Sequence, residues 1–337
     1  MTNKVLNLYP IDYPFETLIM RVQKKSLVLN PDFQRKYKWN KDNEEKTSKF
    51  IESCLMRIPI PACYFAEDES KNHIVIDGVQ RITTIQRFMN NEFELEGLMQ
   101  FPELNGKKFS ELEEYKQDLE HYTIRCIILR KDNNKELIQD IFARLNQGAV
   151  ELTPQEIRHA IFPGNLNNLL GELAQNSIIA NFGNTTSKDG LEAEEQVLRF
   201  YALQNDLETY QGKLSKLLDD YMLKKQDITM EEKEALKELF NETLNKCISV
   251  FGEENVFVNT SNQKPKQSLV HYDLLMWSFK DQDIEYLNKN KEEINSLFIE
   301  LCNMPEFQRT LSGGTQNKGS IIRRRSLWSE KLDGISN

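Results

Sequence analysis

The segment His73–Ile85 carries the residues of this chain whose types and spacing are best suited to chemistry. An apolar strand pattern over residues 73–76 is followed by Asp77-Gly78 and then by a helical pattern from residue 79. The start of a helix offers unpaired backbone N–H groups and a partial positive charge, so it favours anions. Glycine lets the backbone approach a ligand closely, and arginine adds a planar fork for phosphate oxygens. The polar side chains available here are Asp77, Gln80, Arg81, Thr83 and Thr84.

Asp77 has three candidate roles in such a site. Its carboxylate could hold a metal ion such as Mg²⁺, orient Arg81, or position a water molecule. The alternative is purely structural: Asp77-Gly78 is then only a tight turn, and Arg81 is a surface charge. The residues of this one segment do not decide between these interpretations.

Two other segments place polar residues among apolar ones. Residues 30–39 contain Gln34 and Arg35, and residues 142–158 contain Arg144, Asn146 and Arg158. Each has a plain structural alternative. Gln34 and Arg35 could be turn residues beside packed aromatic side chains, and Asn146 is a natural residue at the end of a helix. Arg158 could be a helix-surface charge paired with a nearby acid, for which Asp140 and Glu151 are the candidates.

Taken together and in order, the three segments resemble a known family. Asp77-Gly-Val-Gln-Arg-Ile-Thr-Thr84 is similar to the DGQQR signature of the N-terminal domain of GmrSD-type restriction systems, a ParB/sulfiredoxin-like family. Asn30-Pro-Asp-Phe-Gln-Arg-Lys-Tyr-Lys-Trp39 resembles the family's first motif. Phe142-Ala-Arg-Leu-Asn-Gln-Gly148 and Leu152–Arg158 resemble its third. The resemblance covers about 130 residues of the first half of the chain, and more loosely the helical remainder.

The resemblance implies one shared phosphate-binding pocket. Asp77, Gln80 and Arg81 would be its catalytic residues. The nucleotide-binding residues would be Gln34, Arg35, Gly78, Thr83, Thr84, Arg144, Asn146 and Arg158. One departure affects catalysis more than binding, because Val79 stands where the family has its first glutamine. The sulfiredoxin branch uses a cysteine at this turn, and this turn has none, so we do not expect sulfinic acid reduction.

The charge of the chain restricts how it can bind nucleic acid. With 43 basic and 52 acidic residues the formal net charge is -9. Residues 164–315 hold 15 basic and 25 acidic groups, whereas residues 316–337 hold five basic and two acidic groups. Phosphate contacts dominate affinity for DNA, so an acidic chain needs a concentrated basic site. Arg323, Arg324 and Arg325 form the only such run, and they are candidates for contacting DNA or a phosphate.

Several other classes of protein are excluded or disfavoured. The chain has no GxxxxGK[ST] segment, so it has no P-loop, and no apolar run of about 18 residues that could span a membrane. The N-terminus lacks the apolar stretch of a signal peptide, so we expect a cytoplasmic protein. The five cysteines and four histidines are scattered and contain no CxxC or HExxH pair. We therefore expect structural thiols, and neither a zinc site nor an HNH nuclease centre.

Periodicity predicts an α+β protein made of two domains. In residues 1–163 it indicates strands at 26–30, 61–66, 73–76 and 122–129, and helices after Asn40, over 79–90 and over 135–145. A capping box with proline at the first helical position, Thr153-Pro-Gln-Glu156, begins another helix that ends at Pro163. Residues 164–337 are almost entirely helical in period. We expect a small ParB/sulfiredoxin-like α/β domain over 1–163 and an all-α domain with a basic C-terminal extension over 164–337.

Three functions remain open. The first is a nucleotide-binding, NTP-hydrolysing component of a prokaryotic defence or restriction system that senses foreign or modified DNA. It would use Mg²⁺ and leave cutting to a separate nuclease protein. The second is a sensor or scaffold that binds a nucleotide or DNA phosphate without turnover, which Val79 favours. The third is a nuclease, which the single C-terminal histidine, His271, in an apolar helical context, makes the least favoured.

Overall fold

The structure, a computed structural model, describes residues 6–29, 44–68, 70–133, 137, 141, 153–184, 191–204, 207–261 and 265–335. The chain divides into two compact units, Met1–Leu152 and Thr153–Asn337. The compact units divide before the helix that begins at Pro154, because this helix packs on helices of the second unit. The domain boundary at 163/164 stays a prediction from the sequence. Each unit is described here by itself.

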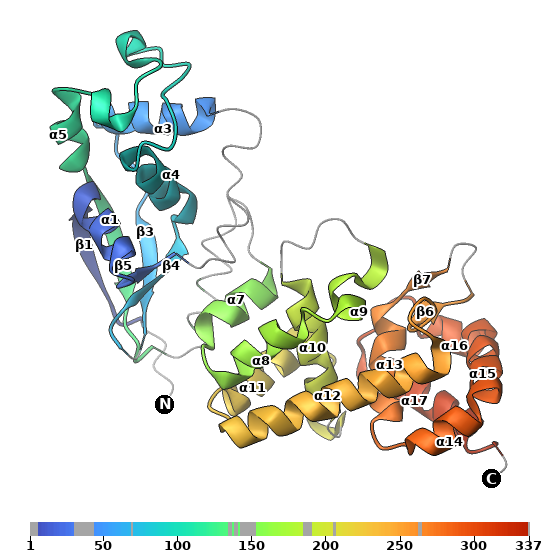
Figure 1. Cartoon of the computed structure of the whole chain (residues 1–337). Coiled ribbons are helices and arrows are strands. Elements are labelled where there is room, and N and C mark those ends of the chain that lie inside the picture. Colours follow the sequence, from blue (N-terminus) through green and yellow to red (C-terminus); the bar gives the residue numbers. More distant parts are fainter. Residues whose placement is uncertain are drawn as a thin grey trace. The chain divides into compact units, whose positions relative to one another are not determined.

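The first unit is built on a five-stranded mixed sheet with the strand order β1-β5-β3-β4-β2 (Figure 1). β1 runs antiparallel to β5 and β3 antiparallel to β4, whereas β5 and β3, and β4 and β2, are parallel pairs. The strands are β1 Leu8–Pro14, β2 Leu27–Val28, β3 Cys63–Glu67, β4 His73–Asp77 and β5 Thr123–Leu129. The strands predicted at 26–30, 61–66, 73–76 and 122–129 are therefore confirmed within a few residues.

Among the described residues of this unit, four α-helices accompany the sheet: α1 Phe15–Gln23, α3 Glu45–Leu55, α4 Val79–Met89 and α5 Tyr115–Glu120. α1 packs against α4, and α3 packs against α4 and α5. Phe15 and Leu18 of α1 and Ile82 and Ile85 of α4 share one buried core with the strands. The predicted helices after Asn40 and over 79–90 are confirmed. The helix predicted over 135–145 falls almost wholly outside the described residues.

β1 and α1 were not predicted from the sequence. β1 contains Pro10 and Pro14, which cannot donate to a sheet ladder and therefore argue against a strand. The structure reconciles this composition with a strand because β1 lies at the edge of the sheet and pairs only with β5.

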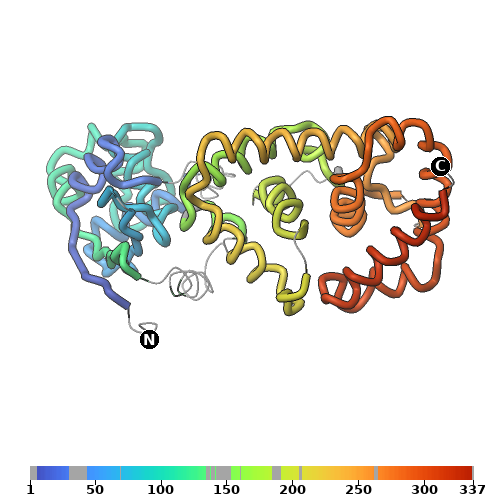
Figure 2. The backbone as a smooth tube through the Cα atoms, turned by 90° about the horizontal axis from the view of Figure 1, so that it is seen from below, coloured from blue at the N-terminus to red at the C-terminus, as the bar shows by residue number. Residues whose placement is uncertain are grey.

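The second unit is helical, as predicted. α12 is its longest described helix and packs against α8, α13, α14 and α15 (Figures 1 and 2). A short β6–β7 ribbon, Val258–Asn259 with Lys266–Gln267, was not predicted. The helices are α7 Pro154–Ile161, α8 Asn165–Leu173, α9 Ser177–Ala180, α10 Glu192–Leu203, α11 Leu214–Lys225, α12 Met230–Phe251, α13 Leu269–Phe279, α14 Ile284–Lys289, α15 Lys291–Asn303, α16 Pro305–Arg309 and α17 Lys318–Leu332.

The core of this unit is one large cluster of buried side chains, among them Trp328, Tyr272 and Phe240. None of the helices in the described part of the chain has the length and apolar character needed to cross a membrane.

Candidate functional site

The structure confirms the strand, the Asp77-Gly78 turn and the helix start that the sequence predicts between β4 and α4. β4 ends at Asp77, Gly78 adopts a left-handed conformation with φ of 103°, and α4 begins at Val79. The first helical bond runs from Ile82 N to Gly78 O over 2.9 Å. The N-cap residue of α4 is Gly78, which has no side chain that could accept a bond from the first amides of the helix.

Gly78 is required at this turn for two physical reasons. A positive φ of this size strains any residue with a Cβ atom. In addition, a Cβ at this position would lie 2.3 Å from Sγ of Cys63, the first residue of the neighbouring strand β3. The glycine thus lets the turn pack onto the sheet, which the sequence alone did not indicate.

The side chain of Arg81 makes its hydrogen bonds and its ion pair with residues of the first unit. Its guanidinium forms an ion pair with the Asp77 carboxylate and donates to the backbone carbonyl of Pro61, with a longer contact of 3.4 Å to that of Ala62. The side chain of Arg81 is 13% exposed. Arg81 therefore connects the turn to the segment that leads into β3. It also presents a partly accessible guanidinium beside the start of α4.

The remaining polar residues of α4 differ in their surroundings. Thr84 is fully buried and donates to Gln80 O over 2.8 Å, one turn back in the helix. Thr83 is also buried, but its Oγ1 has no hydrogen-bond partner among the described residues. Thr83 lies on the same helix face as Val79 and Gln80, because residues three and four apart are neighbours. A buried hydroxyl without a partner is unusual in a folded protein and can mark a site for a ligand or water.

Four of the other residues expected in the pocket lie outside the described residues: Gln34, Arg35, Arg144 and Asn146.

Arg158 lies in the second unit, where it is 1% exposed. It forms ion pairs with Glu195 at 2.9 Å and Asp219 at 2.7 Å and donates to Ser215 Oγ over 2.8 Å. These contacts join α7 to α10 and α11, and its guanidinium is fully engaged within the helical unit.

The predicted start of α7 is confirmed in detail. Thr153 accepts a bond from Glu156 N over 3.2 Å, and Glu156 accepts one from Thr153 N over 2.6 Å. This capping box and Pro154 fix the first turn of the helix. The capping box thereby holds Arg158 at the junction of α7 with its neighbours.

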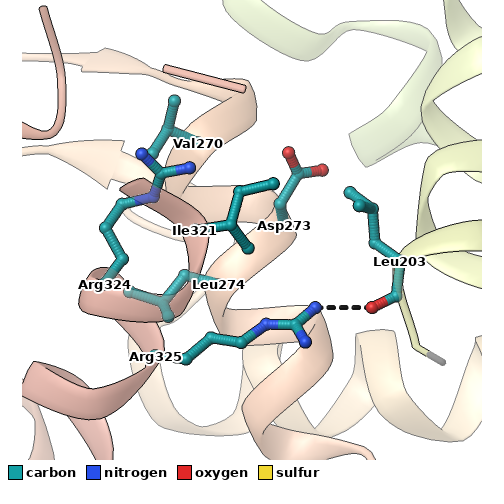
Figure 3. A pocket seen from close by; sticks show the side chains of 7 residues that line it. All are labelled: Leu203, Val270, Asp273, Leu274, Ile321, Arg324 and Arg325. Atoms are coloured by element: carbon teal, nitrogen blue, oxygen red, sulfur yellow. Dashed lines mark hydrogen bonds between the residues drawn. The ribbon is translucent and has the colours of Figure 1, made fainter. Parts of the chain in front are cut away.

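The three adjacent arginines of α17 each have partners within the helical unit. Arg323 pairs with Glu306, and its side chain is 42% exposed. Arg324 is buried and donates to Thr310 O over 2.9 Å and Thr315 O over 2.6 Å. Arg325 donates to Leu203 O, and its guanidinium lies 4.5 Å from the centre of the Trp277 ring. Arg324 and Arg325 line a pocket that Arg323 does not line (Figure 3).

The described cysteines and histidines behave as structural residues. All five thiols are free and buried, and burial raises the pKa values of Cys54 and Cys247. His271 is fully buried, with Nε2 3.4 Å from Sγ of Cys302. In the described ranges no three His, Cys, Asp or Glu side chains are placed to hold a metal ion.

One charged group that sequence reasoning missed is the buried pair of Arg199 and Asp273. Arg199 Nε lies 3.1 Å from Asp273 Oδ1, and its Nη2 contacts the other carboxylate oxygen. These residues are 74 positions apart and lie on α10 and α13, so no local spacing signals the pairing. Both residues lie in segments for which the periodicity of the sequence predicts only a helix.

Comparison with known proteins supports the family resemblance for the first part of the chain. Residues 15–163 match the family described as GmrSD restriction endonuclease, N-terminal domain. The family suspected from the three motifs is thereby confirmed over this segment. No curated protein and no solved structure matches the chain.

Proposed function

We propose that this chain, whose residues 15–163 carry a GmrSD-type N-terminal domain, is a nucleotide-binding and NTP-hydrolysing component of a prokaryotic restriction system. The observation that carries the proposal is the turn at Asp77-Gly78. It joins an uncapped helix start to a partly exposed arginine within the segment that matches the family. As a defence component, the protein would act in the cytoplasm.

Nucleotide phosphate would bind at the start of α4. Backbone N–H groups there and the partial positive charge of the helix terminus attract phosphate oxygens. Arg81 would supply a charge-assisted bond, contributing about 1.5–3 kcal/mol. Because Arg81 is paired with Asp77, the phosphate would compete with the Asp77 carboxylate for the guanidinium. Thr83 Oγ1 would gain the partner that it lacks.

Hydrolysis would depend on Asp77 and Gln80. Once the phosphate engages Arg81, the Asp77 carboxylate is released to orient a water molecule toward the phosphorus, with Gln80 as a further hydrogen-bonding group. Phosphoryl transfer needs mainly positioning and charge stabilisation, both of which this turn provides. The described residues do not form a metal cage, so we assign no step to a protein-bound metal. Mg²⁺ would arrive with the nucleotide.

A second function, binding without turnover, has two specific observations in its favour. Asp77 already has Arg81 as its partner, which restrains the carboxylate. Val79, at the position of the family's first glutamine, packs against the apolar core of the unit and offers no polar group. In this form the protein would act as a nucleotide sensor or scaffold.

In either form, recognition of modified DNA and recruitment of a separate nuclease belong to the proposal. Arg323, whose side chain is 42% exposed, would reach a DNA phosphate more readily than the buried Arg324. A chain that cuts DNA by itself is the least supported alternative, because His271 is packed among Cys302 and the rings of Phe298 and Phe307.

Calorimetric titration of the full chain with ATP, GTP, CTP and UTP tests the proposal. Saturable binding of at least one nucleotide is expected, and no binding of any of them would overturn it. Phosphate release is then measured with the bound nucleotide, with and without modified DNA. Phosphate release above background supports NTP hydrolysis. Tight nucleotide binding without phosphate release supports the second function, binding without turnover. Metal-dependent DNA cleavage by the chain alone would make a nuclease the best supported of the three functions.

A further inference from the structure

Tyr64 on β3 carries an aromatic ring that stands apart from the apolar core of the first unit. Its side chain is half-buried and is not part of the core cluster of this unit. Among the residues that the structure describes, its ring has no aromatic or cationic neighbour and its hydroxyl has no hydrogen-bond partner. The other described tyrosines of the unit all have such partners: Tyr9 contacts Arg130, Tyr13 contacts Arg21, Tyr115 contacts Phe101, and Tyr122 contacts Phe15. The ring of Tyr64 therefore offers a surface for stacking.

The strand pairing places Tyr64 beside Asp77. In the ladder of β3 with β4, Tyr64 is the partner of Asp77. The next residue, Phe65, pairs with Val75, so Ile76 is an extra residue of β4, as in the β-bulges that are common next to active sites. Directly opposite residues of an antiparallel pair share a face of the sheet, with Cβ atoms about 4.5–5.5 Å apart. The side chains of Tyr64 and Asp77 therefore lie side by side, where β3 begins and β4 ends.

Arg81 reaches the same end of these two strands. Its guanidinium pairs with Asp77 and donates to the backbone carbonyl of Pro61, with a longer contact to that of Ala62. Ala62 precedes Tyr64 by two residues, which corresponds to about 7 Å along an extended chain. In a nucleoside triphosphate the base is several bonds away from the terminal phosphate. One nucleotide can therefore place a phosphate at Arg81 and its base at Tyr64.

The surroundings of Tyr64 on its face of the sheet are apolar. Its register partner in β5 is the half-buried Ile127, and Ala66 follows two residues along β3 on the same face. Cys63 and Phe65, on either side of Tyr64 in β3, are fully buried in the core that the strands share with the helices. Tyr64 therefore emerges on the other face, with apolar side chains beside its ring, as a surface for a flat base requires.

We propose that the base of the bound nucleotide stacks on the ring of Tyr64 while its phosphates bind at the start of α4. This role of Tyr64 rests on the function proposed for that turn, and it adds the group that recognises the nucleoside. Stacking on an aromatic ring tolerates every base, because each base has a π face. The ligand is then a nucleoside triphosphate held at both ends, whereas a polyphosphate without a base makes only the contacts at α4.

Comparing ATP with inorganic tripolyphosphate isolates the contribution of the base. Both are titrated as magnesium complexes into the full chain by calorimetry. Tyr64→Leu should weaken ATP binding at least fivefold, because the base loses its stacking surface, and should leave tripolyphosphate binding unchanged. Tyr64→Phe keeps the ring and should bind ATP like wild type. Tyr9→Leu, which removes another half-buried ring, on β1, is the matched control and should also bind ATP like wild type.

Failure of the stacking role and failure of the proposed function give different results. If wild type binds neither ligand, the function proposed for the turn is refuted, and the role of Tyr64 with it. If wild type binds both ligands and Tyr64→Leu weakens both equally, or neither, only the role of Tyr64 is refuted. A loss of ATP binding in Tyr64→Phe as large as that in Tyr64→Leu would refute stacking as well. Circular dichroism checks that each variant is folded.

Discussion

Arg81 and Arg158 both belong to motifs shared with one family, yet the structure gives them different surroundings. Arg81 is partly exposed beside a helix start and holds one carboxylate and two backbone carbonyls. Arg158 is almost fully buried and holds two carboxylates on two other helices. A guanidinium that already binds two carboxylates has little left to offer a phosphate. The comparison therefore gives Arg158 a role in helix packing, and it leaves Arg81 as the arginine of the phosphate site that we propose.

The largest effect should follow from replacing Arg158. Arg158→Ala leaves Glu195 and Asp219 without their partner and removes the connection from α7 to α10 and α11. Removing one member of a buried ion pair costs about 3–5 kcal/mol, and we expect the lower end because both carboxylates are partly exposed. Urea unfolding measures the loss. Arg125→Ala, which breaks an exposed pair with Asp12, is the control and should cost much less, because solvent screens an exposed pair. Equal losses would refute the packing role of Arg158.

Acid offers a second way to destabilise the helical unit. Burial, with Arg324 nearby, lowers the pKa of His271 to about 4, from an ordinary value of 6.5. Between these values the unfolded chain binds more protons, so stability falls as the pH decreases from 6.5 toward 4, by up to about 3 kcal/mol.

Unfolding at pH 7 and pH 5 should show about 2 kcal/mol of this loss in wild type and a smaller loss in His271→Leu. If the free energy of unfolding of His271→Leu falls as much between pH 7 and pH 5 as that of wild type, His271 is not the group responsible for the loss. Burial also lowers the pKa of His73, in the first unit, so that residue contributes in the same direction. The comparison of Arg158 variants should therefore be made above pH 6.5.

Gly78→Ala should destabilise the first unit by about 2 kcal/mol, because it combines a strained positive φ with a clash against Cys63 Sγ. Thermal unfolding measures the effect. The double variant Gly78→Ala/Cys63→Ala removes the clash and should recover part of the loss. No recovery would show that backbone strain alone is responsible.

The smallest effect concerns turnover at the α4 site. Val79→Gln adds the amide that the family pattern has at this position, and one added hydrogen bond contributes about 1 kcal/mol, or roughly a fivefold increase in phosphate release. Val79→Ala controls for the loss of packing against the core. A lower rate in Val79→Gln with intact nucleotide binding would show that this site is arranged differently from the family's.

Local patterns predicted much of the fold. β3, β4 and β5 follow from short apolar runs, and α7 follows from its capping box and proline. β1 was missed because its prolines argue against a strand, and only its place at the sheet edge permits them.

The site was predicted less completely, because long-range partners decide it. Asp140 and Glu151 were the candidate partners for Arg158, but its partners Glu195 and Asp219 lie 37 and 61 residues away. The turn of Asp77, Gly78 and Arg81 was predictable because its geometry is set by neighbours in sequence. The carbonyl acceptors of Arg324 and the approach of Cys63 to Gly78 leave no signal in residue spacing.

The most direct test of the central claim compares two arginines on the same helix. Arg87, like Arg81, lies on α4 in an ion pair, with a side chain 16% exposed against 13% for Arg81. Nucleotide affinity is measured by calorimetry for Arg81→Ala and Arg87→Ala, both confirmed as folded. We expect Arg81→Ala to lose at least tenfold in affinity and Arg87→Ala to bind like wild type. Unchanged affinity in Arg81→Ala, or an equal loss in both variants, would contradict the assignment of the phosphate site to this turn.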